Sequence, residues 1–139
     1  MRRDSGERGT VTLFVLGLCV ALLFLAGLSL DLWRAVAVRR ELSAMADASA
    51  TAGANGVDEA ALRAGELHLD PDRARAFAVQ TLDQYGRTSS LDDVQVEIVG
   101  DQVTVTLHDH VEFSLLGIFM ADEKFEVEVH ASAEPEERP

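Results

Sequence analysis

An unbroken apolar run near the start of the chain is followed by a longer stretch with the spacing of a helix. Residues 10–30 contain 21 positions without a single charge. At about 1.5 Å of rise per residue, a helix of this length covers roughly 30 Å, the thickness of a bilayer's hydrocarbon core. Only a helix lets a single segment satisfy its own backbone groups in lipid. The run therefore predicts a transmembrane helix.

The helical pattern continues through residues 31–55, which contain no proline and no glycine before Gly53. Alanine, the best helix former, is the commonest residue there. A narrow apolar stripe follows steps of three and four residues, apart from one gap of six, and consists of Leu32, Val36, Leu42, Met45 and Ser49. One helix over residues 10–55 is expected, half in lipid and half emerging from it.

Small side chains dominate residues 44–54 of this extension, and they allow another backbone to approach closely. Periodicity leaves two interpretations open, a plain stalk or a packing surface for other subunits. Trp33 stands where an amphipathic ring prefers the headgroup layer. The positions expected to face lipid or another helix are Gly17, Ala21, Asp31, Trp33, Ala44, Asp47, Ala48 and Gly53.

A cleaved signal peptide is the alternative to a retained anchor. Signal peptides have an apolar core of roughly 7 to 15 residues and a cleavage site with small residues. Here the apolar core is longer, residues 26–29 (AGLS) make a poor cleavage site, and the helical pattern continues beyond them. The sequence favours the retained anchor.

The remaining chain changes from helical to strand periodicity. Asp70 and Pro71 form a good helix start, and the helix should end at Gly86. Apolar and polar residues then alternate over 94–99 and 103–108 around a turn at Gly100 and Asp101, which predicts a β-hairpin. A third strand is expected at 125–132, and the apolar piece 113–119 fits either a helix or a strand.

The fold class expected is therefore α+β. A long N-terminal transmembrane helix carries a small domain, in which an antiparallel sheet of about three strands packs on the helix of residues 70–86. The expected division is a basic cytoplasmic lead at 1–9, the membrane helix and its exported extension at 10–55, a small extracytoplasmic α+β domain at 56–133, and a disordered tail at 134–139.

Charge is distributed unevenly along the chain. Residues 1–55 carry a net charge of +1 and residues 56–139 carry −13, for a total of −12. So acidic a domain argues against nucleic-acid binding, which needs a basic surface. Three arginines precede the apolar run and three follow it within ten residues, so their count leaves the orientation undecided. We expect a cytoplasmic N-terminus because the acidic domain is the plausible exported part.

Candidate chemistry is sparse. His108 and His110 share one face of a predicted strand, and such a pair can hold a metal when further ligands are present. Two ligands do not make a site, His130 could join them only if the strand register allows it, and Asp109 points to the other face. No nucleophile elbow, phosphate loop or paired acid and base is recognisable. We therefore expect no catalytic residue, no cofactor and no metal.

The first 55 residues resemble the N-terminal segment of the Tad (Flp) pilus-assembly proteins of the TadE/TadG type. In that family a short basic lead with glycine precedes one membrane helix, an Asp closes the span, and an Ala-rich stretch ends the helix. The matching positions are Gly9, Asp31, Trp33, Arg39, Arg40, Leu42, Ala46, Asp47, Ala48, Gly53 and Ala54.

The resemblance implies a non-enzymatic minor pilin-like or pseudopilin-like component of pilus assembly or a related secretion system. It would be a single-pass protein of the bacterial cell membrane, with the lipid bilayer and other pilin-like or secretion-machine membrane proteins as partners. The candidate processing point lies between Gly9 and Thr10. Processed members typically carry Glu at the fifth position after the cut, whereas this chain has Phe14 and so resembles the TadG-like branch. The alternative function is a membrane-anchored envelope binding module with an acidic domain.

Overall fold

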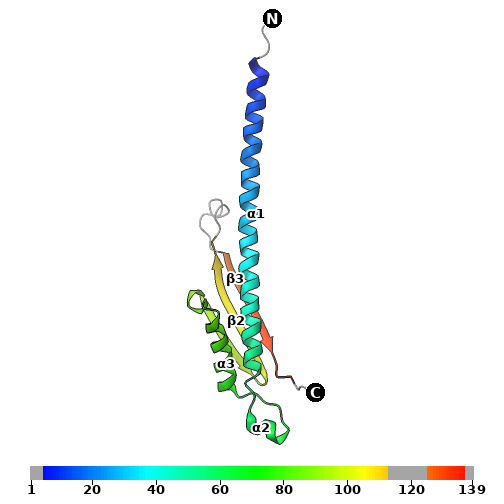
Figure 1. The fold of residues 1–139 in the computed structure, drawn as a ribbon, viewed down its shortest axis with the longest axis vertical. Helices are drawn as coiled ribbons and strands as arrows, with labels where there is room; N and C mark the ends of the chain where they lie inside the picture. The colour runs from blue at the N-terminus through cyan, green and yellow to red at the C-terminus, as the bar shows by residue number, and fades with distance from the viewer. Residues whose placement is uncertain (1–4, 113–124, 137–139) are drawn as a thin grey trace.

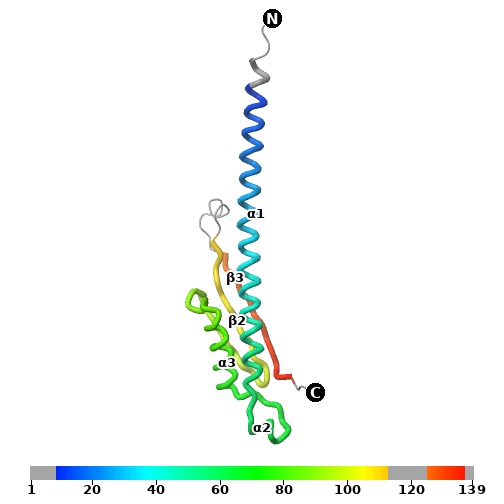
Figure 2. The backbone as a smooth tube through the Cα atoms, viewed as in Figure 1, coloured from blue at the N-terminus to red at the C-terminus, as the bar shows by residue number. Residues whose placement is uncertain are grey.

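One continuous helix dominates the computed structural model, which describes residues 5–112 and 125–136. Helix α1 (Ser5–Ala54) has 50 residues and a length of roughly 75 Å. Its N-terminal half stands clear of the rest of the chain, and its C-terminal half lies against β2, β3 and α3 (Figure 1). The smooth backbone trace shows that the helix has no break between the two halves (Figure 2).

The strands form one antiparallel sheet in the order β1-β2-β3. Their bounds are β1 (Asp93–Val99), β2 (Gln102–Val111) and β3 (Phe125–Ala133). Gly100, with φ of 61°, makes the turn between β1 and β2, and this left-handed conformation favours glycine. The hairpin and the third strand are confirmed, each strand being slightly longer than expected. Residues 113–119, for which the sequence left helix or strand open, lie outside the described residues.

Two short-range capping motifs fix the helices that follow α1. Asp58 accepts hydrogen bonds from the amides of Ala60 and Ala61 and so begins α2 (Glu59–Ala64). Asp70 accepts from the amides of Asp72 and Arg73 at the start of α3 (Pro71–Gln84). Carboxylates at these positions satisfy amides that have no partner within the helix. The expected start of α3 is confirmed, and a 3₁₀ turn, η1 (Thr88–Ser90), follows it.

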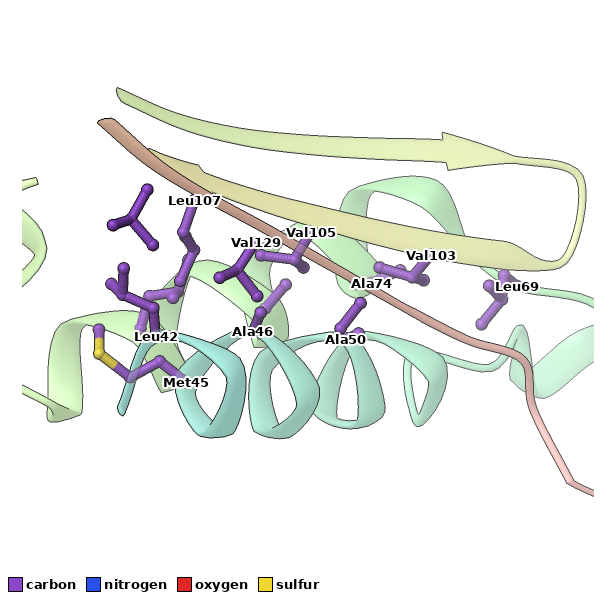
Figure 3. Close-up of a cluster of buried hydrophobic side chains, with 14 of the residues drawn as sticks. Leu42, Met45, Ala46, Ala50, Leu69, Ala74, Val103, Val105, Leu107 and Val129 are labelled. Carbon is purple, nitrogen blue, oxygen red and sulfur yellow. The ribbon is translucent and has the colours of Figure 1, made fainter. Parts of the chain in front are cut away.

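The core lies between the sheet and a layer of two helices. α1 covers β2 and β3, and α3 packs beside α1 and reaches β1. Figure 3 shows Leu42, Met45, Ala46 and Ala50 on α1 opposite Val103, Val105 and Leu107 on β2. Each large side chain buried here contributes about 1.5–3 kcal/mol. The α+β fold class is confirmed, but α1 shares the covering of the sheet that the sequence suggested for α3 alone.

The buried side of α1 agrees with only part of the expected stripe. Leu42, Met45 and Ser49 are fully buried, whereas Leu32 and Val36 are 65% and 42% exposed. The gap of six residues explains the difference, because six residues turn a helix by about 600°, which leaves the two parts of the stripe about 120° apart. Leu32 and Val36 therefore do not share the buried side of α1 with the other three residues of the apolar stripe.

Two glycines at the end of α1 permit close contact with α3. A β-carbon at Gly53 would lie 2.9 Å from Val103 Cγ1, and one at Gly56 would lie 2.5 Å from the amide nitrogen of Ala74. The Gly56 carbonyl also accepts a hydrogen bond of 2.9 Å from the amide of Asp70, the residue that caps α3. Backbone meets backbone at Gly56, so neither partner can move aside without displacing α3.

We predict that Gly56→Ala destabilises the domain by about 1–3 kcal/mol, the usual cost of overpacking. Urea unfolding of the full chain in detergent micelles, followed by far-ultraviolet circular dichroism, measures this change. Gly17→Ala is the matched control, because a β-carbon at Gly17 has nothing within 4 Å. Equal unfolding midpoints for the two variants would contradict the close contact at Gly56.

Candidate functional site: the surfaces of the long helix

The N-terminal section of α1 makes no contact that buries its side chains. The most apolar window has a mean hydropathy of 2.7 and no buried residue, and α1 is the one described helix long and apolar enough to cross a membrane. Leu13, Phe14 and Leu23 are each 71% exposed. Gly17 and Ala21, both expected to pack, are exposed, and so are Gly9 and Thr10 at the candidate processing point. This section therefore exposes apolar side chains that lipid or other helices can contact.

The section around residue 31 marks where the exposed helix becomes part of the domain. Asp31 is only 3% exposed, although Leu30 and Leu32 on either side of it are 67% and 65% exposed. An acid buried at the edge of an apolar span is costly unless it is satisfied, and such residues often have a function. Trp33 is 72% exposed, next to exposed Arg34, which suits the headgroup layer.

An exposed stripe runs down the side of α1 that faces away from the sheet. It follows helical steps of three and four residues through Trp33, Val36, Arg40, Ala44, Asp47 and Thr51, all of them exposed. We call these six residues the outer stripe. It changes from apolar near the span to small and polar near the end of the helix.

The small residues of α1 thus fall into two groups, one buried within this chain and one on or beside the exposed outer stripe. Ala46, Ala50, Gly53 and Ala54 are buried within this chain. Ala44 and Asp47 are exposed on the outer stripe, and Ala48 is half-buried beside it. The sequence suggested close packing for all of residues 44–54. At Gly53 this close packing occurs within the chain, so only the outer stripe remains accessible to a partner.

A pair of salt bridges from Arg87 joins α1 to the sheet. Arg87 donates to Glu41 on α1 over 2.7 Å and to Asp109 on β2 over 2.9 Å. The Asp109 side chain is 6% exposed, whereas that of Glu41 is 49% exposed. A nearly buried carboxylate with an arginine partner stabilises the contact as long as the pair stays intact. Nothing in the sequence pattern pointed to Arg87, which lies just after the end of α3.

The far end of the domain is closed by Asp101 in the hairpin turn. Its carboxylate accepts from the Leu69 amide at 3.0 Å and lies 3.3 Å from His68 Nδ1. The Leu69 hydrogen bond, followed by His68, holds the pKa of Asp101 below its usual value. A lowered pKa means that this stabilisation is present above the ordinary pKa and is lost as pH falls through the lowered one.

The histidines singled out in the sequence separate into different pairs. His110 Nδ1 lies 2.8 Å from Asp92 Oδ2, and His108 Nδ1 lies 3.7 Å from Glu126 Oε1. His130 stands opposite Thr106 in the sheet register. Asp109 points to the buried face, as expected from the alternation along β2. Asp92, which was not expected as a partner of His110, lies 18 residues from it and just before β1.

Comparison with known families concerns the N-terminal half of the molecule. Residues 9–66 match the family model described as "Putative Flp pilus-assembly TadE/G-like", somewhat less than half of the chain. The match begins at Gly9, follows α1 to its end and includes α2, so the resemblance drawn from the first 55 residues is confirmed. No curated protein and no solved structure matches the chain.

We predict that Arg87→Met destabilises the domain by about 2–4 kcal/mol, because Asp109 then stays nearly buried without its cation. Glu41→Gln, which breaks the exposed member of the pair, should cost about 1 kcal/mol or less. Urea unfolding of both variants checks the difference. Equal costs would show that burial of Asp109 does not control the contact.

Proposed function

Taking residues 9–66 as a TadE/G-like pilus-assembly segment, we propose that this chain is a non-enzymatic component of Tad/Flp-type pilus assembly or of a related secretion system. The family match carries the assembly role. We further propose that α1 anchors the chain in the membrane and packs against helices of partner proteins there. The partners are the lipid bilayer and other pilin-like or secretion-machine membrane proteins.

Exposure along α1 supports the packing part of the proposal. No residue in the most apolar window of α1 is buried, so lipid or other helices can contact this section from every side. Gly17 and Ala21 lie four residues apart and so share one side of that section, which allows a neighbouring helix to come close. Beyond the span, the outer stripe continues this accessible surface away from the membrane.

The buried side of α1 makes the anchor part of the domain. A partner that binds the span therefore holds the domain at a fixed angle, because the helix continues without a break from the span to the core residues Leu42 and Ala50. Such a rigid connection suits an assembly component, whose domain must be positioned relative to its neighbours. A binding module on a flexible stalk would have no need of it.

We predict that Ala44→Trp on the outer stripe reduces recovery of membrane partners at least about tenfold, a loss of about 1.4 kcal/mol. A bulky ring there prevents close approach of another helix. Co-purification of the full chain from bacterial membranes, with quantitative mass spectrometry of Tad-type membrane proteins, measures the recovery. The matched control is Ala64→Trp on α2, which is also exposed and lies outside the outer stripe.

Equal recovery with both variants would exclude the outer stripe as a partner surface, and recovery of no pilus or secretion membrane protein by the unaltered chain would contradict the assembly role. The alternative function, an anchored binding module with an acidic domain, is separated by replacing residues 10–30 with an unrelated membrane helix. This replacement should abolish the function of an assembly component, which depends on contacts of the helix, but should leave a binding module functional.

For orientation, we propose a cytoplasmic N-terminus and an extracytoplasmic domain. In a chain carrying Cys19→Ser, a cysteine introduced at Glu97, which is exposed on β1, should react in intact cells with a maleimide that cannot cross membranes. A cysteine introduced at Ser5 should react only after the cells are opened. The reverse result would overturn the proposed orientation.

A further inference from the structure

We propose that Asp92, Asp109 and His110 form a binding site for a divalent first-row metal ion such as Zn²⁺. The site lies at the C-terminal end of β2, between the sheet and the residues that precede β1. It is separate from the outer stripe and from the apolar section of α1, so it adds a property that pilus assembly itself does not require.

Three ligand atoms converge there. One imidazole nitrogen and one oxygen from each carboxylate all lie within 4.8 Å of one another. Tetrahedral bonds of about 2.0–2.2 Å place two ligand atoms on one ion about 3.4 Å apart, so the side chains must move by roughly 1 Å to bring all three onto one ion. A set of one nitrogen and two oxygens suits zinc and similar divalent ions, and it leaves a coordination position for water.

Charge at the site favours a cation. Asp92, Asp109 and Glu41 carry three negative charges and Arg87 carries one positive charge, which leaves two negative charges when His110 is neutral. His110 Nδ1 and Asp92 Oδ2 lie 2.8 Å apart, at hydrogen-bond distance. A metal ion can replace this hydrogen bond and use the same two atoms as ligands.

The carboxylate at the centre of the site is held in place before any ion binds. Asp109 is 6% exposed at its side chain, and it accepts from Arg87 over 2.9 Å and from the His110 amide over 2.8 Å. Outer contacts of this kind orient metal ligands and strengthen binding. Arg87 also contacts Glu41, so an ion at the site would reinforce the attachment of α1 to the sheet.

From the sequence we expected no metal. His108 and His110 were only two ligands, His130 depended on the strand register, and Asp109 was predicted to point to the other face. The structure pairs them differently, since His108 faces Glu126 while His110 faces Asp92 and lies near Asp109. The third ligand, Asp92, lies just before β1, and the hairpin register places it near Asp109, because its neighbour Asp93 pairs with His108.

The test uses the full chain, purified in detergent micelles through a tag without histidine and stripped with EDTA. Titration with Co²⁺, read by its visible absorption, and with Zn²⁺, read by competition with a fluorescent chelator, should give one equivalent bound. The dissociation constant should be on the order of micromolar, weaker than for zinc sites with four protein ligands.

Asp92→Asn and His110→Ala should each raise the dissociation constant at least about tenfold, while His130→Ala, which removes an exposed histidine elsewhere on the sheet, should leave it unchanged. Urea unfolding with and without Zn²⁺ checks that the variants are folded. Zinc should stabilise the unaltered chain and His130→Ala equally, and Asp92→Asn and His110→Ala less. No bound equivalent in the unaltered chain, or an equal loss in His130→Ala, would overturn the site and leave a hydrogen-bonded cluster only.

Discussion

The contact between the C-terminal half of α1 and the inner face of the sheet supports everything else in this molecule. Leu42, Met45, Ala46 and Ala50 supply the helix side of the core, and the sheet side is supplied by alternate residues of β2 and β3. The same helix continues as an exposed apolar section that can cross a membrane. The domain is therefore not attached to this apolar section through a linker, because the helix that carries the section is one of the core elements of the domain.

This arrangement explains why particular small and charged residues occur where they do. Gly53 and Gly56 bring α1 and α3 together at the distal end, where larger side chains would collide with Val103 and Ala74. Arg87 holds α1 to β2 through Glu41 and Asp109. Within the described residues, the hydroxyl of Ser49 is buried without a hydrogen-bond partner, a cost of about 1–3 kcal/mol that the surrounding packing offsets.

Local patterns were enough to predict most elements of the fold. The uncharged run predicted a long apolar helix, Asp70 and Pro71 predicted the start of α3, and the alternation on either side of Gly100 predicted the hairpin. Each of these depends on neighbours in the chain. The third strand followed from its own alternation, although its place beside β2 depends on long-range pairing.

Features that depend on distant contacts could not be predicted in the same way. The helical period showed that α1 has an apolar side but did not show that this side would be buried within the chain and not by another subunit. Leu32 and Val36 lie outside the buried side of α1, because the gap of six residues rotates them about 120° around the helix axis from the other residues of the stripe. Arg87 and Asp92 gained their roles only when the chain folded and brought them to Asp109 and His110.

Hydrogen exchange of the full chain in micelles tests the central claim that the end of α1 is part of the domain core. If it is, the amides of residues 42–54 exchange only when the whole domain unfolds, at the same rate as those of Val103 and Val105 on β2, and both rates rise together in mild denaturant. Fast exchange over residues 42–54 while β2 stays protected would contradict the account, because α1 would then be a separate stalk.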